Sequence, residues 1–274
     1  SMLSNYLNPK FKFNLTLPAE NFYINGEYDK AKKILKRFNI NDSFYYWFKS
    51  TKEAQILVKQ RNNEEGINFL NLKFNKITDP NLKMILDMAI FFKNAQKYDQ
   101  AIDYFTQIID GLDGPSDLKS DLLFRRGSSY EQLKDYKKAD KDLLNSLKMN
   151  PDDAYVLNYL AYSWLERDYK IGEAFQMLEQ AYLSKSNDPY IIDSIGWAYY
   201  LIDNYVEAEK YIKRAVELMP VDPTVNDHYG DILWMLGRRI QARYFWSNVL
   251  SFNDTEEEMK KKVNIKLIEG IKNS

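Results

Sequence analysis

The feature that most constrains this chain is one helical segment, residues 189–220, whose pattern recurs along most of the sequence. In its first half, Ile192, Ile195 and Tyr199 are spaced three or four residues apart, which places them on one face of a helix. A second periodic run follows and stops at Pro220, because proline cannot continue a helix interior. The pattern predicts two amphipathic helices joined by a short turn.

Local signals indicate how the first of these helices begins and packs. Asp188 supplies an N-cap side chain, and Pro189 follows it in the first turn, where a missing N–H costs nothing. Gly196 lies in the middle of the helix, where glycine costs about 1 kcal/mol relative to alanine. We therefore expect another helix to pack closely against Gly196.

The order of residue types in this segment resembles the tetratricopeptide repeat, a helix–turn–helix unit of roughly 34 residues. Residues 189–220 run from a small residue and an aromatic residue through a turn to Tyr, Ala, an aromatic or aliphatic residue, Ala and a closing Pro. The resemblance implies an all-α fold, a right-handed α-solenoid in which each unit rests on its neighbours. No stretch of the sequence shows a convincing strand pattern.

We expect one continuous solenoid with an irregular beginning and a helical cap. Residues 1–20 are expected to be an irregular lead-in, because Pro18 disfavours a helix across them. Residues 21–81 carry helical periodicity but match the repeat poorly, so they are interpreted as degenerate repeats. Residues 257–274 are predicted to form a C-terminal capping helix. Five repeats are expected between these parts, over 82–115, 120–153, 154–188, 189–222 and 223–256.

Composition excludes several kinds of function. The net charge of −1 over 274 residues gives no bulk attraction for nucleic acid or an anionic membrane. No apolar run reaches the roughly 18 residues of a membrane-spanning helix. The absence of cysteine excludes disulfides, thiolate nucleophiles and sulfur-ligated metals. Ser1-Met2 is typical of a cloning scar, so we expect that a signal or lipoprotein segment can precede the natural N-terminus.

Candidate catalytic chemistry is sparse. The single histidine, His228, lies inside a helical pattern and is interpreted as a half-buried or surface imidazole. Asp227 and Asp231 are four residues apart on one helix face, the spacing of a carboxylate pair. Asp227 also lies in a first turn, where the helix dipole favours an anion, so we prefer the structural interpretation. The glycines form no phosphate-binding motif. We expect neither an enzyme nor a cofactor or metal site.

The resemblance also implies where a partner would bind. In tetratricopeptide proteins the first helix of each repeat lines a concave groove, and aromatic side chains there give large contact area at low entropic cost. The alternative is that these rings only pack between neighbouring helices. The groove-facing residues implied here are Phe124, Ser128, Asn158, Tyr162, Leu165, Tyr190, Asp193, Trp197, Tyr200, Asp227, Asp231 and Trp234.

This residue set predicts the chemistry of the partner. Co-chaperones of the family that bind acidic peptide C-termini line the groove with Lys, Arg and Asn, and only Asn158 fits that pattern here. The three aspartates of the set would repel a carboxylate. We therefore expect an apolar or basic segment of a partner protein, with no nucleic acid and no cofactor.

Two segments of the last repeats resemble a narrower group. The segments Asp193–Tyr200 and Gly230–Trp246 look like the C-terminal repeats of long tetratricopeptide proteins of Gram-negative bacteria. Some of these are outer-membrane lipoproteins that act as adaptors for a periplasmic carboxyl-terminal processing protease. The resemblance implies a scaffold or adaptor role and a periplasmic or outer-membrane-anchored location, with the cytoplasm as the alternative. For Arg238, Arg239 and Arg243 we prefer the structural interpretation, in which they pair with acids of the neighbouring unit.

The sequence thus favours a non-enzymatic scaffold or adaptor for an apolar or basic partner segment. The alternative is a substrate-delivery or regulatory module of a larger protein whose catalytic or membrane-anchored part lies outside this sequence. Catalysis by the Asp227/Asp231 pair ranks third.

Overall fold

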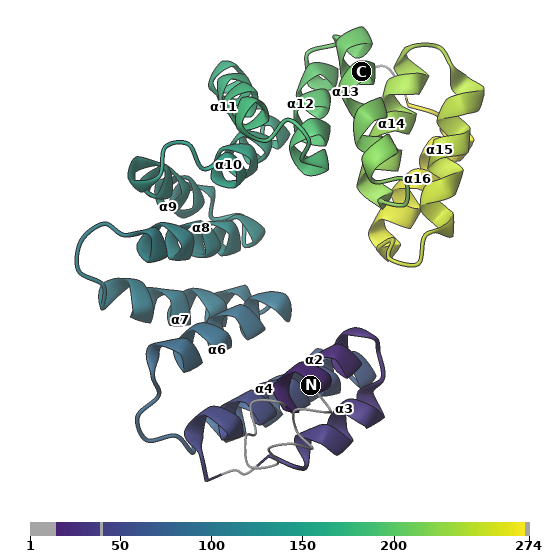
Figure 1. The fold of residues 1–274 in the computed structure, drawn as a ribbon. Helices are drawn as coiled ribbons and strands as arrows, with labels where there is room; N and C mark the ends of the chain where they lie inside the picture. Colours follow the sequence, from purple (N-terminus) through teal and green to yellow (C-terminus); the bar gives the residue numbers. More distant parts are fainter. Residues whose placement is uncertain (1–14, 39–40, 272–274) are drawn as a thin grey trace. The chain divides into compact units, whose positions relative to one another are not determined.

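The computed structural model describes residues 15–38 and 41–271. Within these ranges the chain folds into 15 α-helices and contains no strand, as the repeat pattern predicts (Figure 1). In chain order the helices are α2 (Thr16–Ile24), α3 (Tyr28–Leu35), α4 (Ser43–Gln60), α5 (Asn63–Phe74), α6 (Leu82–Asn94), α7 (Tyr98–Asp110), α8 (Asp117–Gln132), α9 (Tyr136–Met149), α10 (Ala154–Glu166), α11 (Ile171–Ser184), α12 (Pro189–Leu201), α13 (Tyr205–Leu218), α14 (Pro223–Met235), α15 (Arg239–Ser251) and α16 (Glu257–Glu269).

Consecutive helices pack in pairs. Extensive contacts join the pairs α2–α3, α4–α5, α6–α7, α10–α11, α12–α13 and α14–α15. In the pair α8–α9, Arg126 donates to both carboxylate oxygens of Asp142 at 2.7 and 2.9 Å. The fold is therefore an all-helical stack of helix–turn–helix units.

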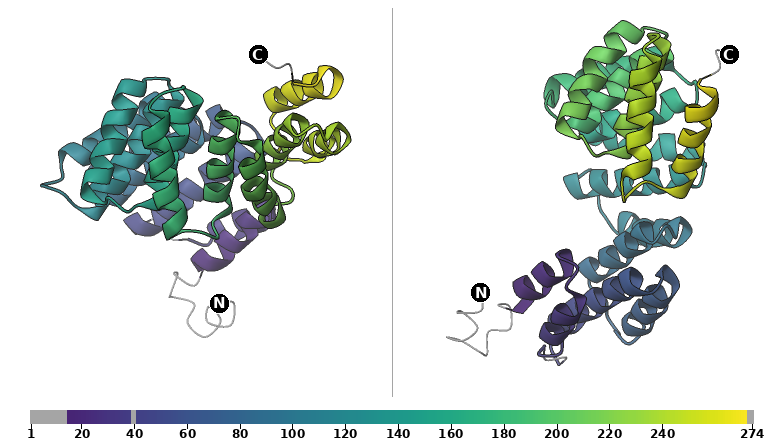
Figure 2. Two further views of the ribbon diagram at one scale, coloured as in Figure 1. Left: turned by 90° about the horizontal axis from the view of Figure 1, so that it is seen from above. Right: turned by 90° about the vertical axis from the view of Figure 1, so that its right-hand side faces the viewer.

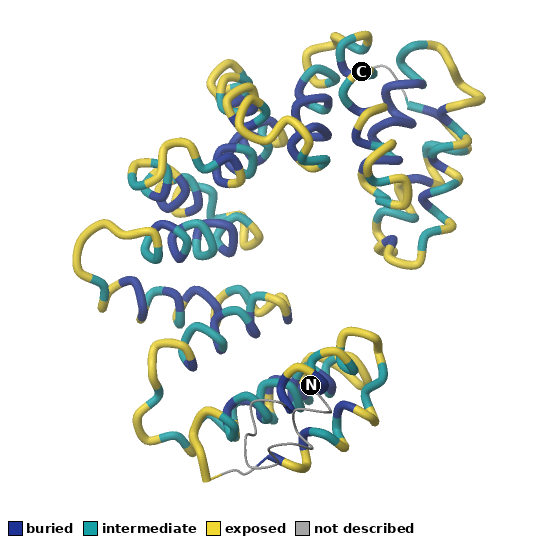
Figure 3. Tube along the Cα trace, viewed as in Figure 1, coloured by how far each residue is buried: buried dark blue, intermediate teal, exposed yellow. Residues whose placement is uncertain are grey.

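The described helices belong to two compact units. Unit 1 contains the residues up to 114 together with residues 128–135, and unit 2 contains residues 115–127 together with those from 136 onward. Each unit has its own buried core, and the prediction of one continuous solenoid stays a prediction. Figure 3 shows buried residues along the helices and exposed residues gathered at the turns between them.

Three repeats of unit 2 begin with the same kind of N-cap residue. Asp153, Asp188 and Asp222 each cap a helix by accepting hydrogen bonds from backbone N–H groups in the first turn. An N-cap carboxylate satisfies donors that the helix itself leaves unpaired. These caps fix the start of α10, α12 and α14, the first helices of three successive repeats.

Close helix approach at Gly196 confirms the expectation from sequence. A Cβ atom at this position would stand 2.7 Å from Cγ1 of Ile212 on α13, a distance that real contacts do not reach. Ile192 and Ile195 flank the glycine and are both buried. Because Gly196 has no side chain, the backbone of α12 can pack directly against the side chain of Ile212 on α13.

Helix α16 covers α15 at the end of unit 2, as the right-hand view of Figure 2 shows. Val263 of α16 is fully buried in a core with Trp246 and Val249 of α15. A Lys-rich terminal helix thus buries an apolar stripe against the last repeat.

The expected irregular lead-in over residues 1–20 is wrong where the structure describes it. Helix α2 begins at Thr16, and Pro18 lies in its first turn. Proline is tolerated there because the N–H of a first-turn residue has no intrahelical acceptor. The rest of the expected lead-in, residues 1–14, lies outside the described residues. Among the described helices, none is both long and apolar enough to cross a membrane.

Candidate partner-binding face

The first helices of three repeats in unit 2, α10, α12 and α14, together with α16 gather a set of aromatic and charged side chains. We call this set the aromatic-acidic face. Its members are Asn158, Tyr162, Glu166, Asp193, Trp197, Tyr200, Asp227, His228, Asp231 and Lys266.

A stack of three rings lies at the centre of the face. The indole of Trp197 stacks on Tyr200 with ring centroids 4.5 Å apart and on His228 with centroids 4.0 Å apart, and both pairs are within 14° of parallel. The indole N–H of Trp197 donates to Glu166 of α10 at 2.8 Å. Sequence reasoning placed Trp197 and Tyr200 on the binding surface, and both are half-buried there.

The imidazole of His228 is held by Asp193. Its Nδ1 lies 3.0 and 3.1 Å from the two carboxylate oxygens. Burial alone would lower the pKa of His228, but the charge and hydrogen bond of Asp193, with Asp227 and Asp231 beyond, raise it above its ordinary value. The expectation of a half-buried or surface imidazole is therefore wrong, because His228 is only 6% exposed.

A second ion cluster joins α14 to α16. The Nζ atom of Lys266 lies 2.7 Å from Oδ1 of Asp227 and 2.7 and 2.8 Å from the two oxygens of Asp231. The indole N–H of Trp246 also donates to Asp231. Burial raises the pKa of Asp231 to about 6, and the Lys266 ammonium opposes that rise. The carboxylate pair is thus part of an internal ion cluster.

The tyrosines of the face stay neutral. Burial raises the pKa of both Tyr162 and Tyr200 far above the ordinary phenol value, and nearby carboxylates, chiefly Glu166 for Tyr162 and Asp231 for Tyr200, add to the effect. Four carboxylates on the face meet one imidazolium and one ammonium, so the net charge is −2 when all are ionised.

One polar atom of the face lacks a partner. The Oδ1 atom of Asn158, on α10, is buried and accepts no hydrogen bond from the described residues. A buried acceptor without a donor is costly, so this amide favours a donor brought by a ligand. Tyr190, at the start of α12, is 62% exposed and available at the surface.

Four residues predicted for the groove are placed differently. Leu165 is wrong as a groove residue, because it is buried in the core of unit 2. Phe124 packs edge-to-face on Tyr159 in the same core region. Ser128 is buried in unit 1 and accepts a hydrogen bond from Lys93 at 2.5 Å.

Trp234 is the fourth residue placed differently. Its indole N–H donates to the carbonyl of Ile271, and Arg239 and Arg243 lie over its ring at 5.2 and 4.9 Å. The chain's own C-terminal segment therefore covers this ring. Of the three arginines expected to pair with neighbouring acids, Arg238 does so, with both carboxylate oxygens of Glu209.

Sequence reasoning missed Glu166, Lys266 and the role of His228. A signal for two of them was present, because His228 follows Asp193 by 35 residues and Lys266 follows Asp231 by the same interval. A basic residue one repeat length after an acidic residue lies on the next first helix, where its side chain can pair with that acid. In the described ranges, no group of three or more His, Asp or Glu side chains is placed to hold a metal ion.

Comparison with known proteins agrees with this geometry. The sequence profile of the tetratricopeptide repeat matches residues 120–153, which cover most of α8 and all of α9. A tetratricopeptide repeat protein from Parabacteroides merdae superposes with a TM-score of 0.72, over 93% of this chain and 98% of that one, at 15% identity. Residues 120–153 are therefore similar to a tetratricopeptide repeat (TPR), and the chain shares the helical-stack fold of solved TPR proteins.

Two other TPR proteins are similar. A thermophilic TPR protein of Thermus thermophilus has a TM-score of 0.59, covers 69% of this chain and all of that one, and is 15% identical. The TPR repeat-containing protein PA4667 of Pseudomonas aeruginosa is 29% identical over 181 residues, which are 66% of this chain. The match covers only 30% of the Pseudomonas protein, so this chain spans less than a third of that relative.

Proposed function

We propose that this protein is a non-enzymatic scaffold that holds a basic or apolar segment of a partner protein on the aromatic-acidic face. TPR proteins generally mediate protein–protein interactions, which supports the general class. The observation that carries the specific proposal is the half-buried ring stack of Trp197 and Tyr200, with the exposed carboxylate of Glu166 beside it.

The stack and the carboxylate together fit a cationic side chain. A Lys or Arg stem lies well along aromatic rings, and its charged head is attracted by the ring faces. One carboxylate oxygen of Glu166 accepts the hydrogen bond from the indole N–H of Trp197. The side chain remains exposed, so Glu166 can still pair with a partner's cation. The unpartnered acceptor on Asn158 adds a site for an N–H donor.

The chain itself contains an example of such binding. Lys266 of α16 lies 6.0 Å from the ring centroid of Trp246 and pairs with two aspartates, while Val263 one turn earlier is buried. A basic helix with an aliphatic residue three positions before its lysine therefore fits this kind of surface. We expect a partner segment with the same combination.

Two narrower functions remain proposals. An adaptor role in the bacterial envelope, for example for a periplasmic protease, rests on the resemblance of the last two repeats alone. A substrate-delivery or regulatory module of a larger protein is supported by the small share of the Pseudomonas relative that this chain spans. In both cases the aromatic-acidic face would be the docking surface.

The decisive experiment is affinity capture with mass spectrometry, using the full chain as bait. We expect the variant Tyr162→Ala/Trp197→Ala and the variant Glu166→Lys to lose partners that the wild type retains. Tyr244→Ala is the matched control, because Tyr244 is 62% exposed on α15 and lies outside the face. If the folded double variant captures an unchanged set of partners, the assignment of this face is wrong.

A further inference from the structure

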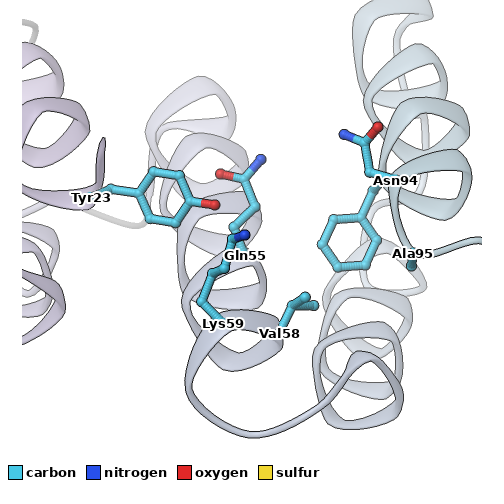
Figure 4. Close-up of a pocket in the computed structure, with 7 residues that line it drawn as sticks. Tyr23, Gln55, Val58, Lys59, Asn94 and Ala95 are labelled. Carbon is cyan, nitrogen blue, oxygen red and sulfur yellow. The ribbon is translucent and has the colours of Figure 1, made fainter. Parts of the chain in front are cut away.

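Two cavities of about 380 Å³ lie in unit 1. The cavity in Figure 4 is bordered by the first helices α4 and α6 and by Tyr23 of α2. The other, which we call the α5–α7 cavity, is bordered mainly by the second helices of the same two hairpins. Its lining residues are Asn71, Phe92, Gln100, Asp103, Tyr104 and Gln107. The binding surface predicted from the sequence lies on first helices, so it does not account for the α5–α7 cavity.

Two stacked rings form the apolar wall of this cavity. The rings of Phe92 on α6 and Tyr104 on α7 have centroids 5.6 Å apart and planes 13° from parallel, and Phe74 meets Tyr104 edge-to-face. Phe92 is buried, whereas Tyr104 is half-buried and borders the open space. Burial raises the pKa of Tyr104, and the charge of Asp103 adds to the rise. The wall therefore offers a ligand an aromatic surface and a neutral phenol.

Polar side chains without partners surround this wall. Asn71 comes from α5, and Gln100, Asp103 and Gln107 come from α7, where their spacing places them on one helix face with Tyr104. In the part of the chain that the structure describes, none of these four polar side chains takes part in a hydrogen bond or an ion pair. Three carboxamides, which both donate and accept, and one carboxylate, which accepts, therefore remain open to a ligand.

A later hairpin contains the same pair of rings. Tyr199 of α12 and Tyr211 of α13 stack with centroids 5.5 Å apart and planes 11° from parallel, as Phe92 and Tyr104 do on α6 and α7. Each pair joins a first helix to the second helix of its hairpin. The two hairpins therefore share one aromatic framework, and their polar residues can be compared position by position.

The polar residues around the two frameworks differ. The positions that carry the three polar residues of α7 carry Glu207, Lys210 and Arg214 on α13. Lys210 pairs with Glu207 at 2.5 Å, and Arg214 pairs with Glu217 at 3.2 Å, so these side chains are paired within their own helix. The unpaired amides and carboxylate of α7 are thus not required by the framework, which favours a role in binding.

The chemistry of the lining selects a class of ligand. A sugar hydroxyl both donates and accepts, so it can pair with a carboxamide in either direction and can donate to Asp103. The C–H face of a sugar ring is apolar and packs well on an aromatic ring. A ligand anion would meet the charge of Asp103, since the described residues of the lining include no Lys or Arg. A Lys or Arg side chain has donors only and would leave the amide N–H groups unpaired.

We propose that the α5–α7 cavity binds a neutral saccharide. A sugar ring lies against Tyr104, one of its hydroxyls donates to Asp103, and further hydroxyls pair with the carboxamides of Asn71, Gln100 and Gln107. The cavity volume lies within the range of about 300–1,000 Å³ that is usual for small-molecule sites. This site is separate from the aromatic-acidic face and does not depend on the function proposed for that face.

A glycan array probed with the fluorescently labelled full chain tests this proposal. The array should carry neutral and acidic monosaccharides, disaccharides and longer glycans, and we expect the chain to retain neutral ones. In isothermal titration calorimetry, replacing a bound hexose by its uronic acid should weaken binding at least tenfold. Equal affinity for a free sugar and for the glycan that ends in it would assign the ligand as a free sugar, and higher affinity for the glycan would assign a polysaccharide.

Variants then assign the site. Gln100→Glu/Asp103→Lys copies the Glu207–Lys210 pair onto α7, so it should keep the urea midpoint of the wild type and weaken saccharide binding at least tenfold. Asn71→Ala should weaken binding severalfold. Lys210→Gln is the matched control, because Lys210 holds the position of Asp103 in the other hairpin, and it should leave binding unchanged.

Three results would overturn the proposal. The first is an array on which the wild type retains no neutral saccharide. The second is equal binding of the retained saccharides by the wild type and by the folded Gln100→Glu/Asp103→Lys variant. The third comes from a peptide array probed in parallel: if the wild type retains peptides that this variant loses, the occupant of the cavity is a protein segment.

Discussion

Nδ1 of His228 on α14 lies 3.0 Å from Oδ1 of Asp193 on α12, so an acid of one repeat holds the base of the next. The same relationship recurs one repeat later, where Lys266 of α16 pairs with Asp231 of α14. Both bases lie 35 residues after their acids. The acidic residues of the face therefore join successive first helices.

The His228–Asp193 pair predicts a pH dependence of stability. The pKa of His228 is raised in the folded state, so the proton binds more tightly there than in the unfolded chain. Its stabilising contribution is complete below pH 6.5 and is lost as the pH rises through the folded pKa. We expect the difference in unfolding free energy between wild type and His228→Gln to shrink from about pH 6 to about pH 9, measured by urea titration. A difference that stays constant or grows would contradict the ion pair.

Removal of the Lys266 ammonium should destabilise unit 2. Lys266→Met leaves two aspartates without their cation, and Asp231 is only 5% exposed. Breaking a fully buried pair costs about 3–5 kcal/mol, and partial exposure of Lys266 lowers our expectation to about 2–4 kcal/mol. Lys262→Met, an exposed lysine on the same helix, is the control and should change stability by less than about 0.5 kcal/mol. Equal effects of the two substitutions in urea denaturation would rule out a structural role for Lys266.

Two glycines should respond to alanine in opposite directions. At Gly196 the added methyl group meets Ile212 at 2.7 Å, so overpacking should cost about 1–3 kcal/mol. At Gly172, in the first turn of α11, the methyl group meets nothing within 4 Å. Gly172→Ala should therefore stabilise the protein by about 0.5–1 kcal/mol through lower chain entropy. Thermal melts of both variants provide the comparison.

Two arginine pairs of similar geometry should differ in energy because they differ in burial. Arg126 pairs with Asp142, whose side chain is 5% exposed, whereas the Arg238 side chain in its pair with Glu209 is 44% exposed. Removing a partner from a buried pair costs about 3 kcal/mol or more, and removing one from an exposed pair costs about 0–1 kcal/mol. We expect Arg126→Ala to lower the urea midpoint clearly and Arg238→Ala to leave it nearly unchanged. The reverse order would show that burial does not decide the energy of these pairs.

The repeat pattern predicted the helices well because it depends on local spacing. Apolar periodicity and the Asp–Pro start before α12 identify helices independently of their neighbours. The close approach at Gly196 could also be predicted, because a glycine in a helix interior needs a packing reason. The helix at Thr16 was missed because Pro18 was interpreted as a breaker, although a first-turn proline is compatible with a helix.

The side chains of the proposed binding face were predicted less well, because side-chain direction depends on neighbouring repeats. Leu165 and Trp234 occupy the expected positions on first helices, but one packs into the core and the other is covered by the chain's own end. The aspartates were expected to be free for a partner, and instead they hold His228 and Lys266.

The pairing of acids and bases between consecutive first helices makes these repeats non-interchangeable. Suppose that the α12–α13 and α14–α15 hairpins were exchanged by gene shuffling. Asp193 would then no longer be followed by the helix that carries His228. Lys266 would lie opposite Trp197, because Trp197 would occupy the position that Asp231 holds now. Each hairpin therefore makes its acid–base pairs only at its present position in the array. To keep these pairs when the array is extended or shortened, an acid on one first helix and a base on the next must be placed at each new junction.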